Sequence, residues 1–224
     1  FGVFAKIAQV FAKEGFGTIF ALAKYFVLVA IVLLIHAFVV YPTMLKIFTG
    51  LNPLVFFKKL RNAQLFAFST ASSNATIPVT LRAAEQRLGA HNKIASFTVP
   101  LGATINMDGT AIMQGVATVF IAQISGIDLS ITQYLTVILA ATMASIGTAG
   151  VPSAGLVMLT MVLGLVGLPP DKIGLIIGID RLLDMIRTAV NITGDTTITC
   201  IVANSEGQLD KKVFNRPFED EIVS

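Results

Sequence analysis

The chain has 224 residues, of which 54% are hydrophobic and 13% are charged. A soluble domain carries about 25% charged residues, so this composition excludes an ordinary soluble domain and favours a membrane protein in contact with lipid. The net charge of +3 does not indicate a nucleic-acid partner, because the basic residues cluster in loops beside apolar segments. Cys200 is the only cysteine, which excludes an internal disulfide.

The clearest predicted membrane span is residues 17–48, with YFVLVAIVLLIHAFVVY at its centre. It is longer than the roughly 20 residues that a bilayer demands, so it can cross with some tilt. His36 lies inside it, and we expect this histidine to bond to a neighbouring helix or to face a polar seam rather than to bind a ligand. Residues 1–16 resemble the end of a preceding transmembrane helix, and because the chain opens in mid-pattern without Met we expect further chain before it.

Two segments, 53–89 and 131–167, are each predicted to form a pair of half-length helices joined by a small polar tip. The tips are STASSNATIP and SIGTAGVPSAG. Pro53 is well placed to open the first of these helices. Helices of this length favour re-entrant hairpins over complete spans. The tips share a weak likeness, ATIP against AGVP, and we interpret the two hairpins as an inverted repeat.

The remaining predicted elements are a helix over 92–126 that is interrupted at NMDGT, a polar helix over 171–204 and a charged tail over 207–224. Seven Lys or Arg residues lie between Lys46 and Lys93, and none lies between Lys93 and Lys172. The positive-inside rule therefore predicts that the loops around residues 46–93 and the tail lie in the cytoplasm, and that the loop near residues 126–130 lies outside. We expect a multi-pass protein of the cell inner (plasma) membrane whose two hairpins enter from opposite sides.

The polar helix carries Asp180, Asp184, Arg187, Asn191 and Asp195 within roughly an 80° sector of one face. Apolar residues cover its other faces. Ionisable groups at membrane depth cost roughly 2.5–3.5 kcal/mol each on insertion scales, so they tend to be retained for function. This face is the main candidate for a binding site.

Irregular backbone at membrane depth survives only where it is buried in protein or lines a polar cavity. The two tips and the break at NMDGT are three such places, and discontinuous helices of this kind build the sites of secondary transporters. Arg187 offers a planar fork suited to a carboxylate, and Asp184 could either pair with it or receive an ammonium group. Asp108 and Asp195, beside amide and hydroxyl oxygens, suit a hard cation such as Na⁺ rather than a transition metal.

Three motifs in register, NMDGT, SIGTAGVPSAG and LDMIRTAVNITGD, resemble the glutamate/aspartate transporters, the dicarboxylate/amino acid:cation symporters. An inverted repeat is an established feature of that family. The resemblance implies the C-terminal part of such a protein, an all-α membrane fold with two oppositely oriented re-entrant hairpins and an unwound seventh helix. Residues 17–206 would form an elevator-type transport domain of a homotrimer that works by alternating access.

The resemblance also implies residue roles. Arg187 and Thr110 would hold the side-chain carboxylate of the substrate, Asp184 its amino group and Asn191 its α-carboxylate. The implied substrate-binding residues are Ser72, Ser73, Thr110, Val151, Gly155, Asp184, Arg187, Thr188 and Asn191. The implied sodium ligands are Gly102, Asn106, Asn191 and Asp195 for one ion, Thr104, Ser145, Ile146 and Thr148 for a second, and Asn106 and Asp108 with ligands from outside this chain for a third.

The chain departs from many members of this family at two places. An additional arginine of those members is absent, since Ala71 and Met185 stand at its two possible positions. Proton-coupled relatives are similar to this chain but have a glutamate at the position of Gln114. The side chain of a glutamine cannot bind and release a proton as a glutamate does. Sodium coupling without a co-transported proton is therefore expected.

The function predicted from these features is a sodium-coupled symporter of aspartate or glutamate, with a C4-dicarboxylate or broader amino acid:cation symporter as the alternative. An intramembrane aspartyl protease, which needs two aspartates sharing a proton, is disfavoured because Ile192 replaces the first glycine of its Gly-x-Gly-Asp pattern. A passive anion channel is a third possibility, which a sodium-independent current would indicate.

Overall fold

The computed structural model describes residues 17–217. Over this range the chain is helical, and its one β-type pairing is an isolated antiparallel bridge between Ala90 and Leu209. The prediction of an all-α protein is therefore confirmed. The predicted end of a preceding helix, residues 1–16, and residues 218–224 of the tail lie outside the described residues.

The first helix is continuous from residue 17 to residue 49, but it changes its hydrogen bonding on the way. It consists of α2 (Gly17–Ile35), a π-helical turn η1 (His36–Val40) and α3 (Tyr41–Thr49). Pro42 has no N–H group and its ring crowds the carbonyl four residues earlier, which accounts for the wider turn just before it. Among the described helices, this is the one that is long and apolar enough to cross a membrane by length and composition.

Each predicted hairpin is a pair of helices. The first contains α4 (Pro53–Thr70) and α5 (Ser73–Arg82), which continues as the π-helical turn η2 (Ala83–Arg87); the second contains α8 (Ile131–Ile146) and α9 (Ala154–Leu165). Pro53 opens α4 as predicted, and the side chain of Asn52 caps it by accepting a bond from the Leu54 amide at 2.9 Å. Ser72 caps α5 by accepting a bond from the Ala75 amide.

The interrupted helix and the polar helix complete the chain. They comprise α6 (Asn92–Ile105), α7 (Asp108–Ile124), the short 3₁₀ turn η3 (Pro170–Lys172), α10 (Ile173–Ser205) and α11 (Lys211–Asn215). The break between α6 and α7 falls on Asn106 and Met107, whose backbone angles are not helical. In contrast, α10 runs for 33 residues without interruption.

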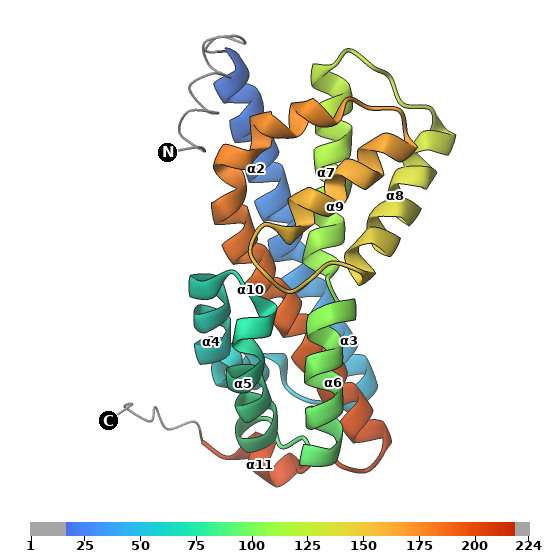
Figure 1. Cartoon of the computed structure of the whole chain (residues 1–224). Coiled ribbons are helices and arrows are strands. Elements are labelled where there is room, and N and C mark those ends of the chain that lie inside the picture. Colours follow the sequence, from blue (N-terminus) through green and yellow to red (C-terminus); the bar gives the residue numbers. More distant parts are fainter. Residues whose placement is uncertain (1–16, 218–224) are drawn as a thin grey trace.

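The helices form two groups arranged end to end along α10 (Figure 1). One group holds α3, α4, α5 and α6, and the other holds α7, α8 and α9, while α10 packs against members of both. The two hairpins approach from opposite ends of the molecule, and their tips meet near the middle of its length (Figure 1). The break between α6 and α7 lies at the same level, so the irregular segments gather at one place.

The distribution of apolar and charged residues is inverted relative to a soluble protein. Large apolar side chains face outward, including Phe20 at 75% exposure and Ile131 at 81%, whereas the charged face of α10 is buried. Lipid hydrocarbon can surround such an apolar exterior without a free-energy cost, whereas exposing it to water is unfavourable. This arrangement is consistent with the membrane location that the composition predicts.

The part of the predicted tail that the structure describes is packed against the first hairpin. Phe214 of α11 is fully buried, and the His91 amide donates to the Gln208 carbonyl at 2.9 Å. Lys59 of α4 is also buried, and its Nζ donates to the carbonyl oxygens of Arg87 and Val213 at 2.9 and 2.7 Å. Residues 207–217 are therefore docked against the rest of the chain in spite of their charged composition.

Candidate functional site

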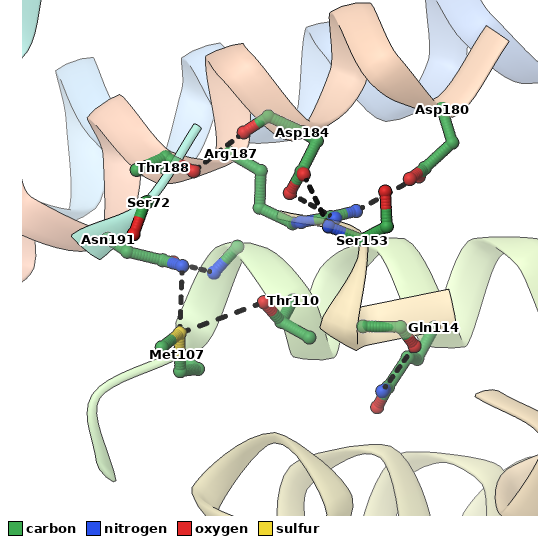
Figure 2. A network of polar contacts seen from close by, with 12 residues as sticks. Ser72, Met107, Thr110, Gln114, Ser153, Asp180, Asp184, Arg187, Thr188 and Asn191 are labelled. Carbon is green, nitrogen blue, oxygen red and sulfur yellow. Dashed lines mark hydrogen bonds and ion pairs between the residues drawn. The ribbon is translucent and has the colours of Figure 1, made fainter. Parts of the chain in front are cut away.

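The polar face of α10 is buried along its whole length. The exposed fractions are 1% for Asp180, 4% for Asp184, 2% for Arg187, 3% for Asn191 and 2% for Asp195. In Figure 2 the side chains of Asp184, Arg187 and Asn191 point toward the start of α7 and the second tip. The five residues that the helical period places on one sector are thus the interior face of the helix.

Arg187 is held by two carboxylates of its own helix. Its Nη1 donates to Oδ1 of Asp180 at 3.2 Å, and its Nη2 donates to Oδ1 of Asp184 (Figure 2). Asp180, which has no role in the sequence prediction, is therefore one of the two counter-charges. A buried guanidinium needs such partners, because an unpaired buried charge is strongly destabilising.

Asp184 also fixes the second hairpin tip. Its Oδ2 accepts a hydrogen bond from the backbone amide of Ser153 at 2.8 Å. Ser153 has a φ of +63°, a left-handed conformation that costs a non-glycine residue energy and is common at functional sites. One carboxylate therefore joins the arginine to the loop that covers it.

A small polar cavity lies where α10, the two tips and the break meet. It is lined by Ala71, Ser73, Met107, Thr110, Thr148, Ala149, Gly150, Val151, Gly155, Asp184, Arg187, Thr188 and Asn191. Eight of the nine residues predicted to bind substrate are in this lining, and Ser72 is the exception. Thr148, predicted as a sodium ligand, is also in the lining, with its hydroxyl bonded to the carbonyl of Ala144.

Ser72 instead joins the two tips. Its hydroxyl donates to the carbonyl oxygen of Gly150 at 2.7 Å, and the amide of Asn74 donates to the same oxygen at 3.0 Å. Gly150 permits this approach, because a Cβ there would lie 2.6 Å from Asn74 Oδ1 and 2.9 Å from the carbonyl oxygen of Ala103. The tips thus close the cavity from opposite ends.

The start of α7 forms the opposite wall of the cavity. The Gly109 amide donates to Oδ1 of Asn191 at 2.8 Å, and Nδ2 of Asn191 lies 3.2 Å from the sulfur of Met107 (Figure 2). A Cβ on Gly109 would lie 2.8 Å from Cγ of Arg187, so only glycine allows this spacing. The break between α6 and α7 therefore lets backbone come within contact of the arginine.

Three residues of the first predicted sodium set, Gly102, Asn106 and Asp195, lie close together. Nδ2 of Asn106 donates to Oδ1 of Asp195 at 2.9 Å, and Gly102 lies so close that an added Cβ would be 2.5 Å from that oxygen. Asn191 lies about one helical turn from Asp195. Its side-chain oxygen accepts a hydrogen bond from the Gly109 amide, and its side-chain nitrogen donates to the Met107 sulfur. The oxygen-rich surroundings of Asp195 suit a hard cation, and among residues 17–217 no three His, Cys, Asp or Glu side chains converge on one point.

The other two predicted sodium sets lie at the ends of α6 and α8 and at the start of α7. Thr104 is exposed and bonds to the carbonyl of Leu101, and within the described chain no hydrogen bond joins it to the rest of its set, Ser145, Ile146 and Thr148. Oδ2 of Asp108 accepts a bond from the hydroxyl of Tyr41 and lies beside Nε2 of His36, each at 3.1 Å. The histidine is thus bonded to a neighbouring helix, as expected.

Sequence reasoning missed Tyr41, Met107 and Ser153 as members of this region. Tyr41 falls in an apolar run, so in sequence it does not differ from an ordinary core residue. For Met107 there was a signal, since it lies inside the irregular NMDGT segment. Gln114 also borders the site, where its Nε2 donates to the carbonyl of Gly155 at 3.2 Å and its buried Oε1 has no partner among the described residues.

Comparison with known proteins identifies the family. A profile described as the sodium:dicarboxylate symporter family matches residues 1–205. The chain belongs to this family. Its members are transporters, not enzymes, which implies a membrane location, a small-molecule substrate and a co-transported ion.

Relatives of the chain carry the name excitatory amino acid transporter. The chain is 48% identical to one from Caenorhabditis elegans over 190 residues, which cover 84% of this chain and 38% of the relative. It is 50% identical over 170 residues to excitatory amino acid transporter 3 of Mus musculus, and the match covers 76% of this chain and 32% of the relative. It is 45% identical over 190 residues to excitatory amino acid transporter 2 of Homo sapiens, and this match covers 84% of this chain and 33% of the relative. The chain thus spans less than two fifths of the length of these relatives.

Proposed function

We propose that this chain contains the substrate and sodium sites of a symporter that couples acidic amino acid uptake to sodium. The observation that carries the proposal is the placement of Arg187 and Asp184 in one buried cavity, capped by both hairpin tips. A guanidinium fork recognises a carboxylate, and a carboxylate recognises an ammonium group. An amino acid with a second carboxylate supplies both partners, and the names of the relatives agree with this substrate class.

Binding of the substrate would proceed by exchange of partners. Arg187 would turn from Asp180 toward the substrate carboxylate, while Asp184 would receive the amino group and release part of its hold on the second tip. That tip would act as the gate, because Ser153 links it directly to Asp184. Sodium would bind next to the cavity through Asp195 and Asp108, so that ion and substrate stabilise the same closed arrangement.

The wider setting of the site is part of the proposal. Residues 17–206 would move as one transport domain in an alternating-access cycle of the elevator type, with both hairpins re-entrant and the C-terminus in the cytoplasm. The protein would lie in the plasma membrane and assemble as a homotrimer. The absence of an acid at Gln114 favours coupling to sodium without a proton.

Binding of radiolabelled aspartate to the purified protein, with and without Na⁺, tests the proposal. We expect saturable binding in sodium and none when choline replaces it. Sodium-independent binding would contradict the coupling. Aspartate and glutamate should compete for the same site.

The alternative, a C4-dicarboxylate or broader carrier, is separated by the variant Asp184→Ser. If Asp184 receives the amino group, the variant loses aspartate binding, and any affinity for succinate, which has no amino group, survives. Retention of aspartate binding would contradict the role of Asp184. Aspartate binding by the unmodified protein with no binding of succinate would exclude the dicarboxylate alternative.

A further inference from the structure

The π-helical turn η1 places His36 and Tyr41 on the same side of the first helix. In an α-helix, residues five apart point roughly 140° away from each other. Here the amide of Tyr41 donates to the carbonyl of His36, and this wider turn brings the two rings into an edge-to-face contact, with centroids 4.6 Å apart and an interplanar angle of 71°. Single π-turns inside α-helices are frequent at functional sites.

Both side chains contact the same oxygen of Asp108. The hydroxyl of Tyr41 donates to Oδ2 at 3.1 Å, and Nε2 of His36 lies 3.1 Å from the same atom. The other oxygen, Oδ1, receives no hydrogen bond from any residue of 17–217. A carboxylate anchored through one oxygen presents the other to a cation in a fixed direction, as outer-shell bonds do at metal sites.

On its other side, the Tyr41 hydroxyl reaches the backbone of α10. A Cβ on Gly194 would lie 2.6 Å from Nδ2 of Asn106 and closer still to the Tyr41 oxygen, so only glycine fits there. Glycine inside a helix costs about 1 kcal/mol relative to alanine. The close approach of the Tyr41 hydroxyl explains why a glycine stands here in spite of that cost. The same Nδ2 of Asn106 donates to Asp195 at 2.9 Å. The Tyr41 hydroxyl therefore bonds to Asp108, and it shares the space beside Gly194 with Nδ2 of Asn106, the donor to Asp195.

A second tyrosine on the same helix separates this arrangement from simple packing. Tyr25 and Tyr41 are each 2% exposed and belong to the same apolar core. The buried hydroxyl of Tyr25 has no hydrogen-bond partner among the described residues. A buried tyrosine hydroxyl thus occurs on this helix without a hydrogen bond to another described residue, whereas the hydroxyl of Tyr41 is bonded to Asp108.

We propose that Tyr41 is a positioning residue for the sodium sites: its hydroxyl orients Asp108 and links it to the Asn106–Asp195 pair, so that ions bound at the two carboxylates bind cooperatively. This inference rests on the proposed function, in which these carboxylates bind sodium. Loss of an outer-shell bond typically weakens metal affinity 10- to 100-fold. Tyr41→Phe removes the hydroxyl alone and keeps the ring beside His36.

The test is a titration of the purified protein with sodium, monitored by binding of radioactive sodium and by the sodium-dependent rise in melting temperature. For Tyr41→Phe we expect the sodium midpoint to rise roughly tenfold and the Hill coefficient to fall. The melting temperature without sodium and the aspartate affinity at saturating sodium should stay unchanged. The matched variant Tyr25→Phe should leave all four quantities as they are.

The outcomes separate this inference from the proposed function. Aspartate binding that needs no sodium in the unmodified protein would overturn both. A sodium-dependent unmodified protein with an unchanged midpoint in Tyr41→Phe would overturn only the role of Tyr41. A lower melting temperature without sodium, together with an unchanged Hill coefficient, would assign Tyr41 to packing and also overturn it.

Discussion

The hydroxyl of Ser72 donates a hydrogen bond to the carbonyl oxygen of Gly150 at 2.7 Å, across 78 positions of the chain. This bond joins the tips of two hairpins that come from opposite ends of the molecule (Figure 1). The amide of Asn74 shares the same acceptor, so Gly150 receives two bonds from the first tip. Any opening of the cavity at this point has to break both bonds.

The variant Gly150→Ala tests whether this contact controls access. The added methyl group would lie within 3.0 Å of Asn74 and of the Ala103 carbonyl, so the second tip has to move away. Overpacking of this kind costs about 1–3 kcal/mol, and we expect aspartate affinity at saturating sodium to fall about tenfold. Gly147→Ala is the matched control, because a Cβ at Gly147 meets nothing within 4 Å. Equal affinities for the two variants would contradict the gating role of the contact.

The buried ion pairs of Arg187 make a prediction about stability. Arg187→Met leaves Asp180 and Asp184 buried without a counter-charge, which costs about 3–5 kcal/mol when a buried pair is broken. We expect a clearly lower melting temperature in detergent and no binding of acidic amino acids. Arg181→Met, on an exposed position of the same helix, should change neither.

A triple variant separates the two effects of that change. Adding Asp180→Asn and Asp184→Asn to Arg187→Met removes the stranded charges, so the melting temperature should recover most of its loss while binding stays absent. Neutral replacement of a whole buried ionic cluster is often tolerated, in contrast to removal of one partner. A triple variant no more stable than Arg187→Met would show that the charges are not the cause.

The local features of this molecule were predictable from sequence because they depend on neighbouring residues. The 3.6-residue period placed Asp184, Arg187 and Asn191 on one face, and that face is buried. Pro53 and the NMDGT segment indicated where helices begin and break. These signals act within one or two helical turns, so one sequence was enough to interpret them.

The features that escaped prediction depend on distant contacts or on the choice of rotamer. Asp180 and Asp184 lie seven and three residues before Arg187, and nothing in the sequence says that the guanidinium divides between both. The meeting of Ser72 with Gly150 requires the two hairpins to be packed first. The docking of 207–217 was concealed because its charged residues suggest a solvated tail, although Phe214 is buried.

Lys59 offers a test of that docked segment. Its Nζ donates to the carbonyls of Arg87 and Val213, and Lys59→Met keeps the length of the side chain but removes both bonds. Losing both hydrogen bonds at these partly buried carbonyls costs about 1–3 kcal/mol, so residues 207–217 should detach more often. We expect trypsin to cut the variant several times faster at Lys211 or Lys212. Lys58→Met, at an exposed neighbouring position, should be cut at the original rate. Equal rates for the two variants would contradict an anchoring role of Lys59.

Cys200 provides a reporter for the opening of the same region. The thiol is fully buried in the cluster that contains Leu45, Ile192 and Phe214, and it is the only cysteine of the chain. A maleimide can reach it only when these helices separate, so labelling should be at least about a hundredfold slower than at an exposed thiol, which corresponds to an opening free energy of about 2.7 kcal/mol.

The reference for that rate is Ser205→Cys in a Cys200→Ala background, since Ser205 is exposed at the end of the same helix. If the docked segment secures this cluster, Lys59→Met should accelerate labelling of Cys200 and leave the rate at position 205 unchanged. Fast labelling of Cys200 in the unmodified protein would contradict the packing of α10 against the first hairpin. A rate at Cys200 that follows the melting curve would instead show that the helices around it separate only when the whole domain unfolds.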